Sequence, residues 1–235
     1  MHGEPMQALI LAGGKGTRLA PFTVSFPKPL VPVGDRPILH HLVERLRETG
    51  FRDIVLSVNH LASLIEAYFG DGAALGVRIR YTREDRPLGT AGPIGVTTDL
   101  AEHFLVMNGD VLTDLDFAAL AAAHRAGTAP ATIVTYRREV PITLGVVVDD
   151  GTGHLGEYRE KPVLSYEVST GIYAMSRVVT RHVVPGEPLD MPELMRRLVG
   201  AGTPPSLYRH AGRWLDIGRV EDYQRAQEEW ERRQR

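Results

Sequence analysis

The sequence contains no cysteine, which excludes disulfide bonds, thiolate metal sites and a cysteine nucleophile. It also lacks any apolar run of the roughly 18 residues that a membrane-spanning helix needs. Residues 1–5 do not show the basic and then apolar layout of a signal peptide. From these absences we expect a cytoplasmic protein without a membrane partner.

A large net charge is missing as well. The chain has 27 Lys and Arg residues against 29 Asp and Glu residues, which gives a net charge of -2 at pH 7. A nearly neutral chain has no overall field that would attract a nucleic acid. Nucleic acid is therefore not an expected partner, and any bound phosphate must be held by a local group of cations.

The first half of the chain alternates between strand-like and helix-like patterns. We predict strands over residues 8–11, 53–58, 77–81 and 103–107, and helices over residues 38–50 and 61–69. This alternation is typical of βαβ units. It predicts an α/β fold with a Rossmann-like mixed, mostly parallel sheet flanked by helices.

The second half has a different pattern. Strands are predicted over residues 132–136, 144–148, 155–158 and 167–175, and helices over residues 191–198 and 220–233. The glycine-containing turn 150–153 would join two of these strands into a small antiparallel insertion. No repeat or long linker divides the chain, so we expect one domain over residues 1–235.

The segment LAGGKGTRL, residues 11–19, directly follows the first predicted strand. It does not have the spacing of a P-loop, because Lys15 precedes its glycine. A dinucleotide-binding fingerprint is also disfavoured, since Leu19 stands at the third glycine position and the acidic residue about 20 positions later, Asp35, lies in a proline-rich loop. Neither of these two glycine-rich motifs describes the segment.

A glycine-rich turn without a ligand is the simplest alternative interpretation. Glycines also allow close approach of a ligand to backbone N–H groups, and Lys15 and Arg18 add positive charge that a plain turn does not need. A second cation, Lys28, follows between prolines in the segment FPKPLVP. We therefore predict a phosphate-binding segment.

Motifs along nearly the whole chain support a more specific interpretation. They are LAGGKGTRLAPFT at 11–23, FPKPLVPVGDRPIL at 26–39, PLGTAG at 87–92, MNGD at 107–110, YREKP at 158–162, STGIY at 169–173 and WLDIG at 214–218. In this order they resemble the sugar-1-phosphate nucleotidyltransferases, or nucleotide-sugar pyrophosphorylases. The combination is most like that of guanylyltransferases acting on mannose, heptose or cyclitol phosphates.

The resemblance implies a reaction and a set of residues. A sugar 1-phosphate would attack the α-phosphorus of a nucleoside triphosphate, with Mg²⁺ as cofactor, and pyrophosphate would leave. Residues 1–115 would mainly bind the nucleotide and residues 116–235 mainly the sugar phosphate. By resemblance, the catalytic residues are Arg18, Lys28, Asp110, Lys161 and Asp216, of which Asp110 and Asp216 would bind the metal. The apolar neighbours of Asp216 suggest that its carboxylate needs such a partner.

The substrate-binding residues are assigned in the same way. The nucleotide would be bound by Leu11, Ala12, Gly13, Gly14, Lys15, Gly16, Thr17, Arg18, Lys28, Gly89, Thr90, Asn108 and Gly109. The sugar phosphate would be bound by Glu160, Lys161, Thr170 and Gly171. Residues 83–86, just before PLGTAG, are interpreted as a solvated turn with no part in binding.

Several alternatives stay open. GTP is the favoured nucleotide, but uridylyl and thymidylyl transfer, of the glucose-1-phosphate or N-acetylmuramate-1-phosphate type, fits most of the same residues. A catalytically silent regulatory homologue and an NAD-dependent dehydrogenase are less favoured. No hexapeptide repeat follows Asp216, so a β-helix acyltransferase domain is not expected. The protein is expected to be a monomer or a homodimer.

Overall fold

The computed structural model describes residues 6–14, 16, 19, 23 and 25–234, and a seven-stranded sheet forms its centre. The strand order is β12-β8-β11-β6-β1-β4-β5. In chain order these strands are β1 (Gln7–Leu11), β4 (Asp53–Val58), β5 (Arg78–Arg83), β6 (His103–Asn108), β8 (Ala131–Pro141), β11 (Val163–Ser176) and β12 (Ser206–His210). Only β11 runs antiparallel to its neighbours in this sheet, so the predicted mostly parallel α/β fold is confirmed.

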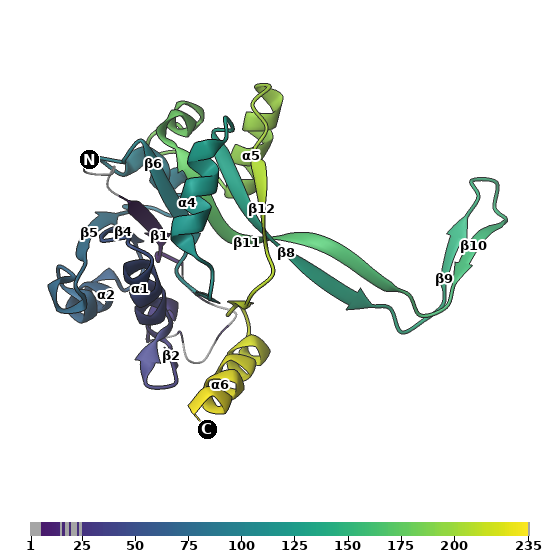
Figure 1. Cartoon of the computed structure of the whole chain (residues 1–235), viewed down its shortest axis with the longest axis horizontal. Coiled ribbons are helices and arrows are strands. Elements are labelled where there is room, and N and C mark those ends of the chain that lie inside the picture. The colour runs from purple at the N-terminus through teal and green to yellow at the C-terminus, as the bar shows by residue number, and fades with distance from the viewer. Residues whose placement is uncertain (1–5, 15, 17–18, 20–22, 24, 235) are drawn as a thin grey trace.

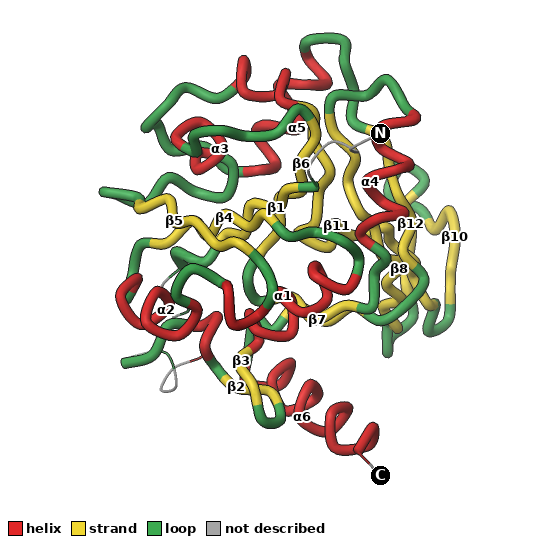
Figure 2. The backbone as a smooth tube through the Cα atoms, turned by 60° about the vertical axis from the view of Figure 1, so that its left-hand side comes forward, coloured by secondary structure: helices red, strands yellow, loops and turns green. Residues whose placement is uncertain are grey.

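Helices cover both faces of the sheet (Figures 1 and 2). Helices α1 (Ile38–Glu48), α2 (Ala62–Phe69) and α4 (Phe117–Ala126) pack on one face, and α3 (Gly92–Val96) and α5 (Met191–Gly200) pack on the other. Side chains alternate between these faces along each strand. In β1, Ala8 and Ile10 join the first core cluster and Leu9 joins the second.

A third, smaller cluster attaches the last helix, α6 (Val220–Gln234). It includes residues of two short antiparallel strand pairs. These are β2 (Pro32–Val33) with β3 (Arg36–Pro37) and β7 (Val111–Thr113) with β13 (Trp214–Asp216). Three 3-10 turns, η2 (Lys28–Leu30), η3 (Ala73–Leu75) and η4 (Arg177–His182), complete the elements used below. No helix in the described part of the chain combines the length and apolarity that crossing a membrane requires.

Some elements were not predicted. The sequence FAALAAAHRA of α4 is apolar on almost every side, so it shows no helical stripe, although Asp116 caps it by accepting a hydrogen bond from Ala119 N at 3.0 Å. Strand β12 lies at the edge of the sheet and contains Ser206, Arg209 and His210. Because its composition is polar, the strand does not show the apolar run that predicts a buried strand.

The predicted antiparallel insertion exists, as β9 (Val146–Asp149) paired with β10 (Leu155–Arg159). Its connection to the sheet is longer than predicted, because β8 continues to Pro141 and β11 begins at Val163. Figure 1 shows these strands leaving the sheet as a ribbon that carries β9 and β10 away from the body of the protein. We call residues 137–169 the arm.

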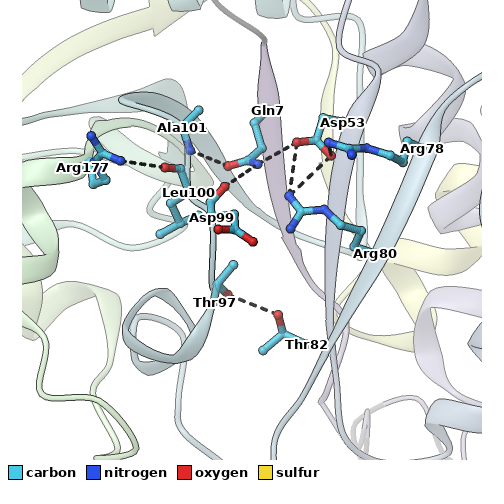
Figure 3. Close-up of polar contacts among 10 residues, drawn as sticks. All are labelled: Gln7, Asp53, Arg78, Arg80, Thr82, Thr97, Asp99, Leu100, Ala101 and Arg177. Carbon is cyan, nitrogen blue, oxygen red and sulfur yellow. Dashed lines mark hydrogen bonds and ion pairs between the residues drawn. The ribbon is translucent and has the colours of Figure 1, made fainter.

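The amino ends of the parallel strands are joined by a buried polar network (Figure 3). The Gln7 side chain donates to Asp53 Oδ2 at 2.7 Å and accepts from Ala101 N at 2.9 Å. Arg80 also donates to Asp53 Oδ2, at 3.2 Å. Burial raises the pKa of Asp53, but hydrogen bonds from Gln7 and Arg80 outweigh burial and lower it overall. The network ties β1, β4 and β5 together at the edge opposite the pocket described below.

A second buried network fixes α4 to the sheet. The His124 ring is 3% exposed, with Nδ1 at 2.9 Å from Thr132 Oγ1 and Nε2 at 3.1 Å from Ser176 Oγ. Burial, helped by the nearby His103 and Arg125, lowers the pKa of His124 from 6.5 to about 4. The ring is therefore neutral in the folded protein at pH 7.

This shift predicts a loss of stability in acid. The unfolded chain takes up a proton at His124 near pH 6.5, whereas the folded chain does so only near pH 4, so the free energy of unfolding falls between these values. Between pH 7 and pH 5 we expect His124 to contribute a loss of about 2 kcal/mol. Urea unfolding of the wild type and of His124→Gln measures it, and equal pH dependence in the two proteins would contradict the assignment.

Candidate active site

A pocket opens where β1 and β6 end side by side. Leu11 and Asn108, the last residues of these strands, are neighbours in the parallel register. From β1 the chain moves outward through β4 to β5 and then returns to β6 on the other side, so the pocket lies at the reversal of strand order where open α/β sheets bind ligands. The cavity has a volume of about 440 Å³ and is lined by Leu11, Ala12, Gly13, Gly14, Gly16, Lys28, Pro29, Glu84, Pro87, Leu88, Gly89, Thr90, Asn108, Gly109, Asp110 and Gly218.

The glycine segment after β1 forms one wall. Gly14 has no atom within 4 Å of the place where a side chain would begin, so its backbone is open to the pocket. Gly16 has a φ of +61°, and a side chain there would meet Lys28 Cβ at 2.9 Å. Glycine is thus needed to bring this backbone against Lys28. Of the predicted nucleotide-binding residues, Lys15, Thr17 and Arg18 lie outside the described residues.

Lys28 and Asp110 form an ion pair at the floor of the pocket. Lys28 begins η2, between Pro27 and Pro29, and is only 8% exposed. Its Nζ donates to Asp110 Oδ2, whereas Asp110 Oδ1 is buried and has no hydrogen-bond partner among the described residues. A buried carboxylate oxygen with unused lone pairs is costly unless a ligand completes it. Such an oxygen fits a hard divalent cation such as Mg²⁺.

Asp216 approaches Asp110 through the β7–β13 pair. Asp216 is the partner of Val111 in the register, and the next residue, Ile217, donates its N–H to Asp110 O at 3.1 Å. Asp216 itself is exposed, so the expectation of an apolar setting for its carboxylate is wrong. Strand alternation explains the difference, because Leu215 and Ile217 point to the buried side.

The donor set fits a magnesium site that is completed by substrate. No group of three or more His, Asp or Glu residues in the described chain could hold a metal ion by itself. Mg²⁺ is commonly bound by one or two carboxylates together with substrate phosphates and waters. Asp110 and Asp216, on adjacent strand ends, would supply the two carboxylates.

The opposite wall of the pocket comes from the PLGTAG segment. Gly89 has a φ of +74°, and a side chain there would come within 2.6 Å of Leu189 O. Thr90 is held by accepting a hydrogen bond from Met191 N at 2.7 Å. These contacts press the segment against the start of α5, and both Gly89 and Thr90 line the pocket. Their role in nucleotide binding stays a prediction.

Glu84 is a pocket residue that the sequence interpretation missed. Residues 83–86 were interpreted as a solvated turn, but Glu84 lines the pocket and is half-buried. Its Oε1 accepts a hydrogen bond from Ser57 Oγ at 2.7 Å and its Oε2 accepts from Leu88 N at 2.9 Å. Glu84 follows β5 at the edge where β1 and β6 end, and this position was the available signal.

Gly171 lies against the pocket residue Asn108, whereas the side chain of Thr170 points away from the pocket into the sheet. A side chain on Gly171 would come within 2.5 Å of Asn108 Nδ2, so Gly171 lies directly behind a pocket residue. Thr170 is 2% exposed, and its hydroxyl donates to Val134 O at 2.9 Å. The Thr170 hydroxyl is therefore used inside the sheet, and the missing side chain of Gly171 leaves room for the Asn108 amide.

Replacing Gly171 with alanine is expected to reduce activity by displacing the Asn108 amide. Gly171 has a φ of +75°, so the alanine also strains the backbone by about 1 kcal/mol. Gly202→Ala is the matched control, because Gly202 has the same φ of +75°, has no atom within 4 Å and lies outside both the pocket and the arm. Thermal unfolding should show similar losses for both variants, and turnover should fall only in Gly171→Ala. Equal turnover in the two would contradict this role of Gly171.

Glu160 and Lys161 are not brought to the pocket. They lie on the arm between β10 and β11, with side chains 61% and 66% exposed. Lys161 Nζ is 3.9 Å from Glu160 Oε1, and neither residue lines the cavity. The predicted sugar-phosphate residues are thus divided between the pocket region and the arm.

Comparison of the sequence with known protein families identifies the family of this chain. The sequence profile of the Nucleotidyl transferase family matches residues 7–233. The chain belongs to the nucleotidyl transferase family. The resemblance seen in the motifs is therefore confirmed at the level of the family.

Named relatives of this chain include enzymes for two different nucleotides. It is 38% identical to a UTP–glucose-1-phosphate uridylyltransferase of Synechocystis over 94% of this chain and 62% of the relative. It is also 38% identical to a mannose-1-phosphate guanyltransferase of Schizosaccharomyces pombe over 93% of this chain and 62% of the relative. The chain thus spans about three fifths of the length of these curated relatives.

Solved structures match this chain over more of their length. HddC from Yersinia pseudotuberculosis, complexed with GMP-PN, has a TM-score of 0.73 at 25% identity and covers 95% of this chain and 99% of its own. A glucose-1-phosphate thymidylyltransferase from Bacillus anthracis, described as putative, has a TM-score of 0.74 at 24% identity, over 95% of this chain and 94% of its own. The second likeness supports the fold alone.

Proposed function

We propose that this protein transfers a nucleotidyl group from a nucleoside triphosphate, preferably GTP, to a sugar 1-phosphate or a sugar-like cyclitol phosphate. The products are a nucleotide-sugar and pyrophosphate. The observation that carries the proposal is the Lys28–Asp110 pair beside an open glycine backbone at the end of β1. Family membership adds that named relatives perform uridylyl and guanylyl transfer.

The reaction asks the protein to position and neutralise phosphates rather than to form a covalent intermediate. An oxygen of the sugar phosphate forms a bond to the α-phosphorus, and the bond from that phosphorus to the pyrophosphate oxygen breaks. Lys28 and the backbone N–H groups of residues 13, 14 and 16 would stabilise the charge that develops on pyrophosphate. By resemblance, Lys15, Thr17 and Arg18 would act on the same phosphates.

Mg²⁺, held by Asp110 and Asp216, would neutralise phosphate charge when it is bound. The unpartnered Oδ1 of Asp110 supports this role. On the acceptor side, Lys161 would bind the sugar phosphate and Glu160 the sugar hydroxyls, with Thr170 and Gly171 shaping the wall behind Asn108. In this proposal residues 1–115 mainly serve the nucleotide and residues 116–235 mainly the sugar phosphate.

The preference for GTP is supported by Glu84. Its Oε1 lies 3.2 Å from where a side chain on Gly13 would begin, so the carboxylate borders the pocket next to the glycine segment. Each carboxylate oxygen accepts one internal hydrogen bond and keeps a second lone pair. Guanine presents two adjacent donors, N1–H and N2–H₂, to such a group. Uracil and thymine present one donor between two carbonyl acceptors, which a carboxylate would repel.

A substrate panel tests the proposal. Pyrophosphate release is measured with Mg²⁺, with GTP, UTP, dTTP, ATP and CTP, and with the 1-phosphates of mannose, heptose, glucose, N-acetylmuramate and cyclitols. We expect turnover with one acceptor and the highest rate with GTP. A highest rate with UTP or dTTP would replace the guanylyl assignment by the uridylyl or thymidylyl alternative. No turnover with any pair in the folded protein would favour a silent homologue.

A further inference from the structure

The arm has no core of its own. Not one residue from 137 to 169 is buried. Eight of the fifteen large apolar side chains that are exposed among the described residues lie on it, and they are Val140, Leu144, Val147, Val148, Leu155, Tyr158, Val163 and Tyr166. Exposed apolar side chains in such number on one segment indicate a contact surface.

The secondary structure of the arm also needs support from outside. Strand β12 pairs with β8 only as far as Tyr136, and β6 pairs with β11 only from Ile172 onward. Beyond these points β8 and β11 pair with each other alone, and β9 and β10 likewise form a two-stranded sheet. An isolated two-stranded ribbon is marginally stable in water, and its open edges invite pairing with another chain.

The body of the same chain is poorly placed to cover the arm. The β8–β11 ladder continues without interruption from Val168 and Tyr136 to Val163 and Pro141. At about 3.3 Å per residue, this ribbon carries β9 and β10 some 15–20 Å beyond the sheet. Figure 1 shows the same separation. The register of the β8–β11 pair shifts between Ser169 and Tyr173, where the ribbon leaves the sheet, and from Ser169 outward the ladder holds β9 and β10 away from the pocket of the same chain.

The charges of the arm favour a second copy over a charged polymer. Both signs alternate along it, in Arg137, Arg138, Glu139, Asp149, Asp150, Glu157, Arg159, Glu160, Lys161 and Glu167. A surface for nucleic acid or an anionic membrane would carry one sign. A mixed surface can be complementary to itself in a two-fold dimer, in which the same patch faces its own copy.

The residues that line the pocket indicate why a second copy of the chain would be needed. The described residues that line it include one cation, Lys28, and this cation is already paired with Asp110. The arm carries Lys161, whose side chain is 66% exposed and whose one ion pair within the described part of the chain is with Glu160, at 3.9 Å. A second phosphate group, that of the sugar substrate, needs a further cation. Lys161 can meet this need if the arm reaches a pocket on another molecule.

We propose that two copies of this chain exchange their arms, so that Lys161 of each copy enters the pocket of the other and binds the sugar phosphate there. This inference rests on the proposed function for the role of Lys161. The arm also has the size of an interface, because a standard interface takes about 20–30 residues from each partner. The apolar side chains of the arm are covered by the partner copy.

Complementation between two inactive variants tests the exchange. Asp110→Asn inactivates the pocket and leaves the arm intact. Lys161→Ala leaves the pocket intact and removes the cation of the arm. The two are co-expressed with different affinity tags, and the heterodimer is purified through both tags. If the arms are exchanged, one of its two sites combines an intact pocket with an intact arm, and we expect about half of the wild-type turnover. If each arm serves its own pocket, no site is intact and turnover stays at the level of the single variants.

Sedimentation gives a readout that does not depend on activity. We expect the wild type to sediment as a dimer, and Leu144→Asp combined with Leu155→Asp to sediment as a monomer whose body still unfolds cooperatively, at a thermal midpoint lowered only by the loss of the partner. Both side chains are exposed in the single chain, at 73% and 61%, so the body should fold normally. A monomeric wild type overturns the exchange, and so does an active wild type whose heterodimer shows no recovery. An inactive wild type that is still a dimer counts against the proposed function and leaves the interface supported.

Discussion

Asp110→Asn is expected to lower the rate of pyrophosphate release by about 10²–10³-fold or more. The change removes one unit of negative charge from an oxygen pair that Lys28 and a divalent cation share in the proposed reaction. Oδ1 is buried without a hydrogen-bond partner among the described residues, so no other protein group there competes for the position at which the cation would bind. The loss should therefore appear mainly in kcat.

The fold should survive this substitution. The asparagine side-chain oxygen can still accept from Lys28 Nζ, so we expect the free energy of unfolding to fall by about 1–2 kcal/mol. Asp116→Asn is a matched control, since asparagine also caps helices and Asp116 lies outside the pocket. Near-normal turnover of Asp110→Asn would remove Asp110 from the proposed metal site. A comparable loss in Asp116→Asn would point to a general effect of the substitution.

Glu84→Gln is expected to lower kcat/KM for GTP by about 10–100-fold, because a hydrogen bond to a charged group contributes about 1.5–3 kcal/mol. The glutamine amide would present a donor to guanine, which itself presents two donors. UTP and dTTP should lose less or gain, because one amide can pair with a donor and a neighbouring carbonyl. The measurement is kcat/KM for GTP, UTP and dTTP with the same acceptor.

The hydrogen bonds that Glu84 makes inside the protein are compatible with the substitution by glutamine. The glutamine oxygen can accept from Leu88 N, and its amide group can donate to the Ser57 hydroxyl, so the segment keeps both hydrogen bonds. Asp85→Asn is the matched control, since the neighbouring Asp85 is exposed and does not line the pocket. A uniform loss for all three nucleotides would indicate that Glu84 acts only through the shape of the segment.

The position of the pocket could be predicted because it depends on local rules. An apolar strand followed by glycines at residues 13, 14 and 16 and a second apolar strand followed by Gly109 and Asp110 place both segments at one edge of a parallel sheet. The helix that begins at Ile38 and the strand over residues 53–58 follow from periodicity in the same way. These features need no knowledge of distant contacts.

The features that were missed depend on tertiary contacts. Glu84 sits in a polar stretch that is typical of solvent-exposed turns. Its place directly after β5 was the one available signal, and the packing of β5 beside β4 brings it to the pocket through Ser57. The side of β13 on which Asp216 lies depends on its pairing with β7. Residues 137–143 and 159–166 show nothing that reveals whether a ribbon folds over the sheet or extends from it.

The placement of Lys161 has the same origin. The motif Glu160–Lys161–Pro162 predicts a binding role, but the length of the β8–β11 ladder decides how far from the sheet the motif lies. That length is set by hydrogen bonding between segments far apart in sequence, such as Val140 with Leu164. The family motif therefore predicts a role for these residues, and the structure places them away from the pocket of the same chain.

The central claim is that the pocket at the ends of β1 and β6 transfers a nucleotidyl group. Its most direct test is a reaction with GTP labelled at the α-phosphorus, Mg²⁺ and the panel of sugar 1-phosphates. We predict that the label moves into a nucleotide-sugar and that the released pyrophosphate carries none. Label that remains in GTP with every acceptor, in a protein whose folding has been verified and with the other nucleotides equally inert, would contradict the account.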